Sequence, residues 1–135
     1  LPNLQETFTN LTTLFMKTFY DELGTPTIQL LVTTFYQEVF RSPIINQLFQ
    51  TDKEEIQRKQ FLFLTQFLGG PNNYSTEFGH PKMRMRHLPH KIDEAAKNEW
   101  LRCMKKAIDS LAITEDLKSR LFQVFPPVAS HMVNH

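Results

Sequence analysis

Apolar residues recur along the chain at spacings of three and four, which is typical of helices that bury one face. The clearest example lies between residues 25 and 43. Thr25 and Pro26 are expected to be its N-cap and first helical residue, and Ser42 with Pro43 should end it. Its expected inner face holds mostly apolar and aromatic residues: Ile28, Leu31, Val32, Phe35, Tyr36, Val39 and Phe40.

Further helices are expected after a short helical turn at residues 44–49. One covers residues 52–68 and should end at Gly69-Gly70-Pro71, because glycine suits a helix C-cap and proline cannot continue a helix. Its inner face is expected to comprise Ile56, Gln60, Phe63, Leu64 and Phe67.

The second half of the chain is expected to hold an irregular stretch at 71–80, then a short helix enclosed by Pro81 and Pro89. Residues 92–113 begin acidic and become basic, as the helix dipole favours. A last helix should begin at Thr114 and be kinked or broken at Pro126-Pro127. The inner face of the 92–113 helix is expected to hold Ala96, Trp100, Cys103, Met104, Ala107, Ile108 and Leu111.

These elements predict an all-α domain over residues 19–135, preceded by an N-terminal extension, residues 1–18, that is itself expected to be helical. A short helix between prolines is unusual in up-down bundles and is tolerated in globin-like folds. The pattern therefore favours a globin-like arrangement.

Composition narrows the function classes. The 135 residues suit one domain, and 12 Phe with only 4 Gly indicate an apolar interior that suits a dense core or an apolar ligand. A net charge of +1 gives nucleic acid no general attraction. No signal peptide or membrane-length apolar run is evident, and the single Cys103 excludes an intramolecular disulfide, so a cytoplasmic protein with an inert buried thiol is expected.

The stretch GHPKMRMRHLPHKI, residues 79–92, carries His80, His87 and His90 and no carboxylate. Met83 and His87 share a helical face at i, i+4. Three interpretations remain open: a solvated basic surface, a zinc site built from three histidines, or a single axial histidine, His87, whose neighbouring cations receive the carboxylates of a ligand such as haem. The cations of this stretch are Lys82, Arg84, Arg86 and Lys91.

Three of the expected inner faces each contain one hydrogen-bonding side chain, namely Tyr36, Gln60 and Trp100. Each alone is more often a core or rim residue than a ligand contact. A buried amide without partners costs a few kcal/mol, roughly 1–3. Three such groups in a Phe-rich core therefore favour a ligand pocket over plain packing.

Several ordered motifs, taken together, resemble the bacterial group II truncated hemoglobins: TFYQEV, KQFLFLTQFLGGPNNYS, GHPKMRMRHLPHKI, EWLRCMKKAID and SHMVN. The resemblance runs from Tyr20 to Asn134. It implies a two-over-two helical sandwich that binds haem b, with His87 as the iron ligand and Tyr36, Gln60 and Trp100 facing the bound gas. The further haem contacts that it implies are Phe49, Ile56, Phe63, Met83, Arg86 and Ile92.

The resemblance also implies small ligands: O2, NO, CO or peroxide. Hydrogen-bond donors beside bound O2 imply slow release, which favours O2/NO or peroxide chemistry over oxygen delivery and requires an electron donor or reductase. The alternative is a non-catalytic oxygen-binding, storage or sensing protein; a haem-free helical interaction module is a third possibility. A homodimer is one possible assembly. The chain departs from its relatives at His90-Lys91, where they keep apolar residues, and His90 is expected on the solvent side.

Overall fold

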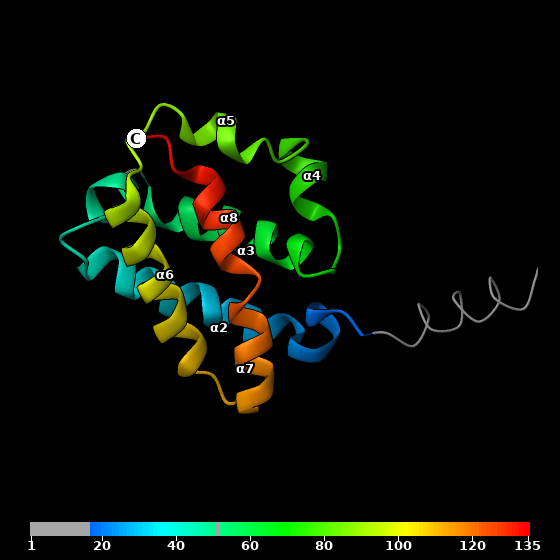
Figure 1. The fold of residues 1–135 in the computed structure, drawn as a ribbon. Helices are drawn as coiled ribbons and strands as arrows, with labels where there is room; N and C mark the ends of the chain where they lie inside the picture. Colours follow the sequence, from blue (N-terminus) through cyan, green and yellow to red (C-terminus); the bar gives the residue numbers. More distant parts are fainter. Residues whose placement is uncertain (1–16, 51) are drawn as a thin grey trace, which may run out of the picture.

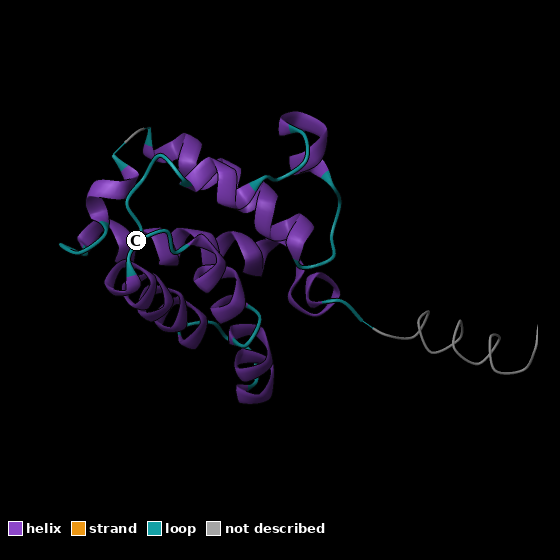
Figure 2. Ribbon diagram, turned by 45° about the horizontal axis from the view of Figure 1, so that its top comes forward, coloured by secondary structure: helices purple, strands orange, loops and turns teal. Residues whose placement is uncertain are grey.

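The computed structural model describes residues 17–50 and 52–135, with the side chain of Arg84 excepted. Almost all of the expected N-terminal helix, including Leu11, Leu14 and Phe15, lies outside the described residues. Within them the chain is helical, without a strand (Figures 1 and 2). The elements are α2 (Phe19–Arg41), the 3-10 helix η1 (Asn46–Phe49), α3 (Lys53–Phe67), α4 (Asn73–Phe78), α5 (Met83–His87), α6 (Glu94–Asp109), α7 (Glu115–Phe122) and α8 (Phe125–Met132).

Two helix pairs form the body of the molecule. α2 packs against α3, α6 packs against α8, and the extensive contact between α2 and α6 joins the two pairs. Short α5 lies along the edge of the molecule away from α2 and packs against α8 (Figure 1). The arrangement confirms the expected all-α class.

A buried polar contact joins α2 to α6. The Ser42 hydroxyl, at the C-cap of α2, donates to Oε2 of Glu99 at 3.2 Å, and Glu99 is only 8% exposed. Arg102 also pairs with Glu99, which neutralises the buried carboxylate. Because Glu99 directly precedes Trp100, this contact holds the helix that carries Trp100 against the helix that carries Tyr36.

Two expectations about the helices need correction, and a third is confirmed but incomplete. α2 begins at Phe19 with a capping box on Thr18, so Thr25 is not its N-cap; Gly24 and Pro26 instead mark a kink within it. Residues 71–80 are not wholly irregular, because α4 forms there, its Ser75 held by hydrogen bonds from and to the Gln66 side chain. Pro126-Pro127 break the last helix as expected, but they also begin α8, where a missing N–H is harmless.

Cys103 lies on the buried face of α6 and is fully inaccessible to solvent. Burial raises the pKa of the Cys103 thiol to about 11. The thiol is therefore protonated at neutral pH and packs as an apolar group, as expected from its place in the sequence.

Gly69 allows the end of α3 to approach the start of α2. Its φ is +102°, and a Cβ built there would lie 2.6 Å from the Cβ of Thr18. Gly79 has a similar φ of +80° but nothing within 4 Å of such a Cβ. We therefore expect Gly69→Ala to lower the free energy of unfolding by about 1–3 kcal/mol more than Gly79→Ala does, as measured by urea titration. Equal losses in the two variants would mean that backbone strain alone decides the cost.

Candidate functional site

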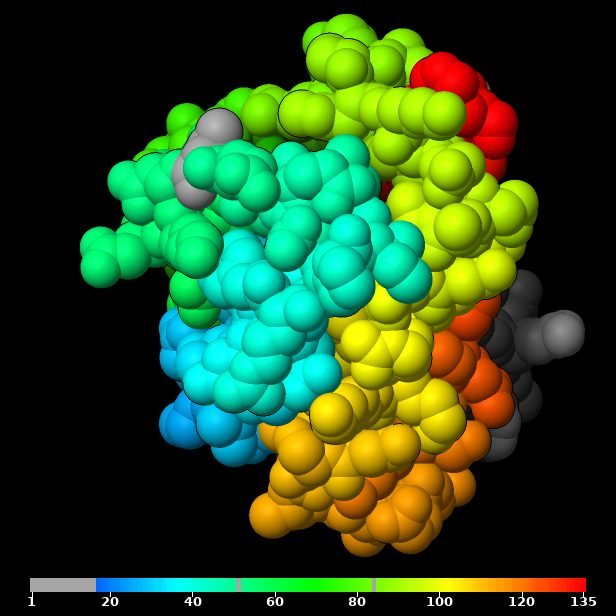
Figure 3. All heavy atoms as spheres, turned by 90° about the vertical axis from the view of Figure 1, so that its left-hand side faces the viewer, coloured from blue at the N-terminus to red at the C-terminus, as the bar shows by residue number. Residues whose placement is uncertain are grey.

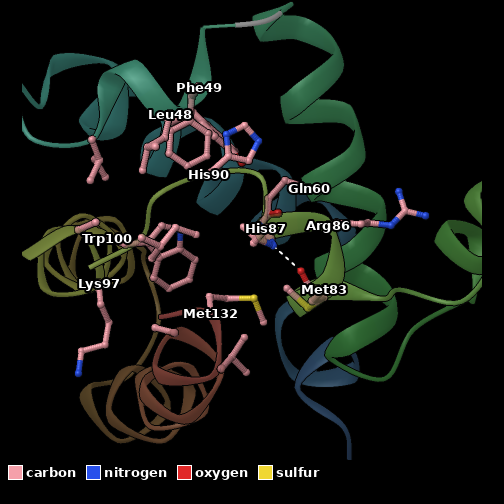
Figure 4. A pocket seen from close by; sticks show the side chains of 16 residues that line it. Leu48, Phe49, Gln60, Met83, Arg86, His87, His90, Lys97, Trp100 and Met132 are labelled. Atoms are coloured by element: carbon pink, nitrogen blue, oxygen red, sulfur yellow. Dashed lines mark hydrogen bonds between the residues drawn. The ribbon is translucent and has the colours of Figure 1, made fainter. Parts of the chain in front are cut away.

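A cavity of about 220 Å³ opens between α5 on one side and α2, α3, α6 and α8 on the others (Figure 4). It brings together eight of the residues singled out in the sequence: Tyr36, Phe49, Gln60, Met83, Arg86, His87, Ile92 and Trp100. Ile56 and Phe63 do not line it. They are half-buried and pack against the core, with the Phe63 ring stacked on Phe67 at 5.7 Å between centroids.

His87 reaches the cavity from the last residue of α5. Its Nδ1 lies 2.6 Å from the carbonyl oxygen of Met83, one helical turn earlier (Figure 4). Because a carbonyl can only accept a hydrogen bond, this contact places the proton on Nδ1 and leaves the lone pair of Nε2 free. The imidazole is thus oriented as a metal-binding histidine would be.

Tyr36 is the most buried polar residue of the cavity wall, at 4% exposure. No described residue makes a hydrogen bond to its hydroxyl, whereas its ring packs against Phe35 at 5.0 Å and Phe49 at 5.8 Å. Burial raises the pKa of the phenol above its usual 10.0, so the group is a neutral hydrogen-bond donor at ordinary pH. The hydroxyl is not among the fully enclosed unpartnered atoms of the described residues, so it opens onto the cavity, where it can donate to a ligand.

Trp100 and Gln60 point into the same space as His87 (Figure 4). Trp100, on α6, is held by edge contacts with Phe35 at 5.1 Å and by Phe125 at 5.9 Å. Gln60 lies in the middle of α3, and no described residue pairs with its side-chain amide. Hydrogen-bonding groups from α2, α3 and α6 therefore converge on one cavity whose remaining wall is mostly apolar.

The cations near the cavity differ in their hydrogen-bond and ion-pair partners. Arg86 donates to the carbonyl oxygen of Phe78 at 3.2 Å, and its guanidinium points away from the centre of the cavity (Figure 4). Lys97 pairs with Glu94 at 2.7 Å. His90 is exposed, as expected, and also borders the cavity. Among the described residues no carboxylate pairs with Lys82 or Lys91, so the basic character of residues 79–92 is not neutralised by the fold.

The zinc interpretation is not supported. No group of three or more His, Cys, Asp or Glu side chains in the described part of the chain is close enough to hold a metal ion. His87 alone cannot hold an ion firmly, so an iron atom at its Nε2 would have to bring its other ligands with it, as haem iron does. An imidazole with a free Nε2 beside an apolar cavity wall is compatible with such a group.

Several wall residues were missed in the sequence. Ile45 and Leu48 lie within the expected helical turn at residues 44–49, in which a role had been assigned to Phe49 alone, and Val128, Ala129 and Met132 come from α8. The regular apolar spacing within α8 is the signal that would have found the last group. Ala96 and Lys97 could have been predicted from the expected helix at residues 92–113, since they lie one helical turn before Trp100 and share its face. No helix in the portion that the structure describes is both long and apolar enough to cross a membrane.

Comparison with known proteins identifies the class: the chain belongs to the family of bacterial-like globins, whose model matches residues 18–134. It is 42% identical over 115 residues to the group 2 truncated hemoglobin YjbI of Bacillus subtilis, an alignment that covers 85% of this chain and 87% of that protein.

Solved structures agree. The group II truncated hemoglobin from Bacillus anthracis is 40% identical with a TM-score of 0.83, over 88% of this chain and 92% of that one. The truncated oxygen-avid haemoglobin from Bacillus subtilis is 41% identical with a TM-score of 0.82, over 87% and 100%. The expected globin fold and the resemblance to group II truncated hemoglobins are confirmed, and haem b is the cofactor of globins of this kind.

Proposed function

We propose that His87 is the axial iron ligand of a haem b held in this cavity, and that the protein binds O2 and other diatomic ligands on the face lined by Tyr36, Gln60 and Trp100. When bound, the haem iron supplies an open coordination position and one-electron redox chemistry. The observation that carries the proposal is the pair formed by an oriented imidazole with a free Nε2 and a tyrosine hydroxyl that opens onto the same cavity without a described hydrogen-bond partner.

The polar residues would act as hydrogen-bond donors. A bound O2 molecule carries partial negative charge, so the Tyr36 hydroxyl and the Trp100 indole N–H can donate to it, with the Gln60 amide as a third donor. In a water-poor pocket each such bond contributes on the order of 1–3 kcal/mol. Two or three of them slow the release of O2 by orders of magnitude, which suits chemistry on O2 better than delivery.

The basic segment 79–92 would serve the cofactor's carboxylates. Lys82 and Lys91 are free of described carboxylates, and Arg86 is bonded only to a backbone carbonyl. A propionate is a stronger acceptor for a guanidinium than a neutral carbonyl is. Arg86 can therefore exchange the Phe78 carbonyl for a propionate, whereas Lys97, already paired with Glu94, gains less from such a change.

We accordingly assign the protein to O2-dependent NO oxidation or peroxide chemistry, with an electron donor that returns the iron to the ferrous state. Mixing the oxygenated ferrous protein with NO in a stopped-flow instrument should convert it within milliseconds to the ferric form with nitrate as product. A reductase-coupled assay should then sustain turnover. Persistence of the oxygenated spectrum under excess NO and excess peroxide would favour the alternative, a protein that stores or senses O2 without turnover.

A further inference from the structure

The side chain of Asn134, near the C-terminus, bonds to the backbone that follows His87. Its Oδ1 accepts from the N–H of Ile92 at 2.9 Å, and its Nδ2 donates to the carbonyl oxygens of His90 at 2.8 Å and His87 at 3.3 Å. The N–H of Asn134 itself donates to the Ile92 carbonyl at 2.9 Å. Figure 3 shows the red C-terminal end lying against the yellow-green segment that contains these residues.

The segment held in this way has few hydrogen bonds of its own, such as that from the His90 N–H to the His87 carbonyl oxygen at 2.9 Å. α5 has 5 residues, fewer than an isolated helix needs to form, and it is followed by a loop up to Asp93, the N-cap of α6. Among the described residues, the hydrogen-bond partner of the His87 imidazole is the Met83 carbonyl, within the same short helix. The direction of Nε2 therefore follows the backbone of residues 83–92, and Asn134 bonds that backbone from outside at His87, His90 and Ile92.

The same contacts connect the C-terminus to the cavity wall. Met132, two residues before Asn134, is 9% exposed and lines the cavity, as do His87, His90 and Ile92. Displacement of the C-terminal residues would therefore move two walls of the pocket at once. The packing of α5 against α8 is the further link between these walls.

We infer that Asn134 is a positioning residue for the axial ligand: its amide sets the backbone of residues 87–92 and thereby the placement of the His87 imidazole. The inference rests on the proposed role of His87. The chemistry is specific to an amide, because one end must accept a hydrogen bond and the other must donate two. An aspartate of the same size keeps the acceptor but places a carboxylate oxygen against two carbonyl oxygens.

The test compares Asn134→Asp and Asn134→Ala with two control variants. Ser130→Ala changes an exposed residue of α8 in the same C-terminal segment. Thr114→Ala removes the N-cap of α7, whose hydroxyl accepts from Leu117 N–H at 3.2 Å, and so lowers overall stability away from the cavity. For the haem-loaded protein we would measure haem transfer to excess apomyoglobin, the iron–histidine stretching band of the ferrous form by resonance Raman spectroscopy, and urea unfolding.

We expect haem transfer to be about tenfold faster or more in Asn134→Asp, with Asn134→Ala between it and wild type, and the iron–histidine band to shift or broaden in both. Thr114→Ala should unfold at lower urea while keeping the wild-type band, and Ser130→Ala should match wild type. A wild-type band and haem transfer rate in Asn134→Asp would overturn the inference. Failure of the proposed role of His87 would give a different result from failure of this inference, because wild type itself would then show no iron–histidine band.

Discussion

Replacing His87 with alanine should abolish the ferrous absorption spectrum of the wild-type protein. The His87 imidazole is oriented by the contact of its Nδ1 with the Met83 carbonyl, and in its neutral form it can offer Nε2 to a metal ion. Without it the iron has no strong protein ligand, and haem would be held only by the apolar wall and the basic rim. We expect haem retention on gel filtration to fall by at least about tenfold, since changes even to the partners of a metal ligand have effects of that size.

Rescue of a His87→Gly variant by free imidazole provides a positive control. Free imidazole added to His87→Gly should restore the five-coordinate ferrous spectrum, because it can occupy the vacated position. His80→Ala and His90→Ala should keep that spectrum without any addition. If His87→Ala retained a wild-type ferrous spectrum, the axial assignment would be wrong, and His80 and His90 would be the next candidates to test in combination with it.

Local patterns in the sequence predict the long helices well. α3 and α6 begin at aspartate N-caps, Asp52 and Asp93. α6 buries most of its predicted face, because apolar spacing reports a buried stripe. The prediction for α3 is only partly right: Leu64 is buried, whereas Phe67 is 41% exposed. The pattern fails at the junctions. A proline pair both ends one helix and suits the first turn of the next, so Pro126-Pro127 could be read as a break without revealing that α8 follows.

The site residues that could be predicted are those whose side chains do not fit simple apolar packing. Tyr36, Gln60 and Trp100 stand out because each interrupts an apolar face, and His87 stands out between two prolines. Along α3, however, Gln60 lines the cavity while Ile56 and Phe63 do not. Residues one turn apart are displaced by about 5.4 Å along the helix, so a shared face does not imply a shared contact with a small cavity.

Asn134 illustrates the other limit. Its contacts lie 42 to 47 residues away in the sequence, and an asparagine near a C-terminus carries no local pattern that predicts them. Only the packing of α8 brings it to the segment after His87. Long-range hydrogen bonds of this kind depend on the assembled fold, so they emerge from the structure alone.

Removing the buried donors should speed the release of O2. Tyr36→Phe and Trp100→Phe each delete one donor while keeping an aromatic ring in the wall, and we expect each to raise the O2 dissociation rate by roughly 10-fold or more, as measured by stopped-flow displacement with CO. The double variant should release O2 faster than either single one. Tyr74→Phe is the matched control, because Tyr74 is a buried tyrosine outside the cavity.

Tyr36→Phe should also separate function from stability. The hydroxyl has no described hydrogen-bond partner, so deleting it costs the protein no internal bond. We therefore expect the haem-free Tyr36→Phe protein to be at least as stable to urea as wild type, although the haem-loaded variant loses O2 faster.

The effect of Tyr36 on O2 release should not depend on pH near neutrality. Because burial raises the pKa of this phenol, it remains a donor throughout the neutral range. The ratio of the O2 dissociation rate of Tyr36→Phe to that of wild type should therefore be the same at about pH 6 and about pH 9. An unchanged O2 dissociation rate in both single variants and the double variant would mean that neither donor reaches the ligand. Slow release would then have to arise from the apolar wall, which can hinder escape but cannot donate a hydrogen bond.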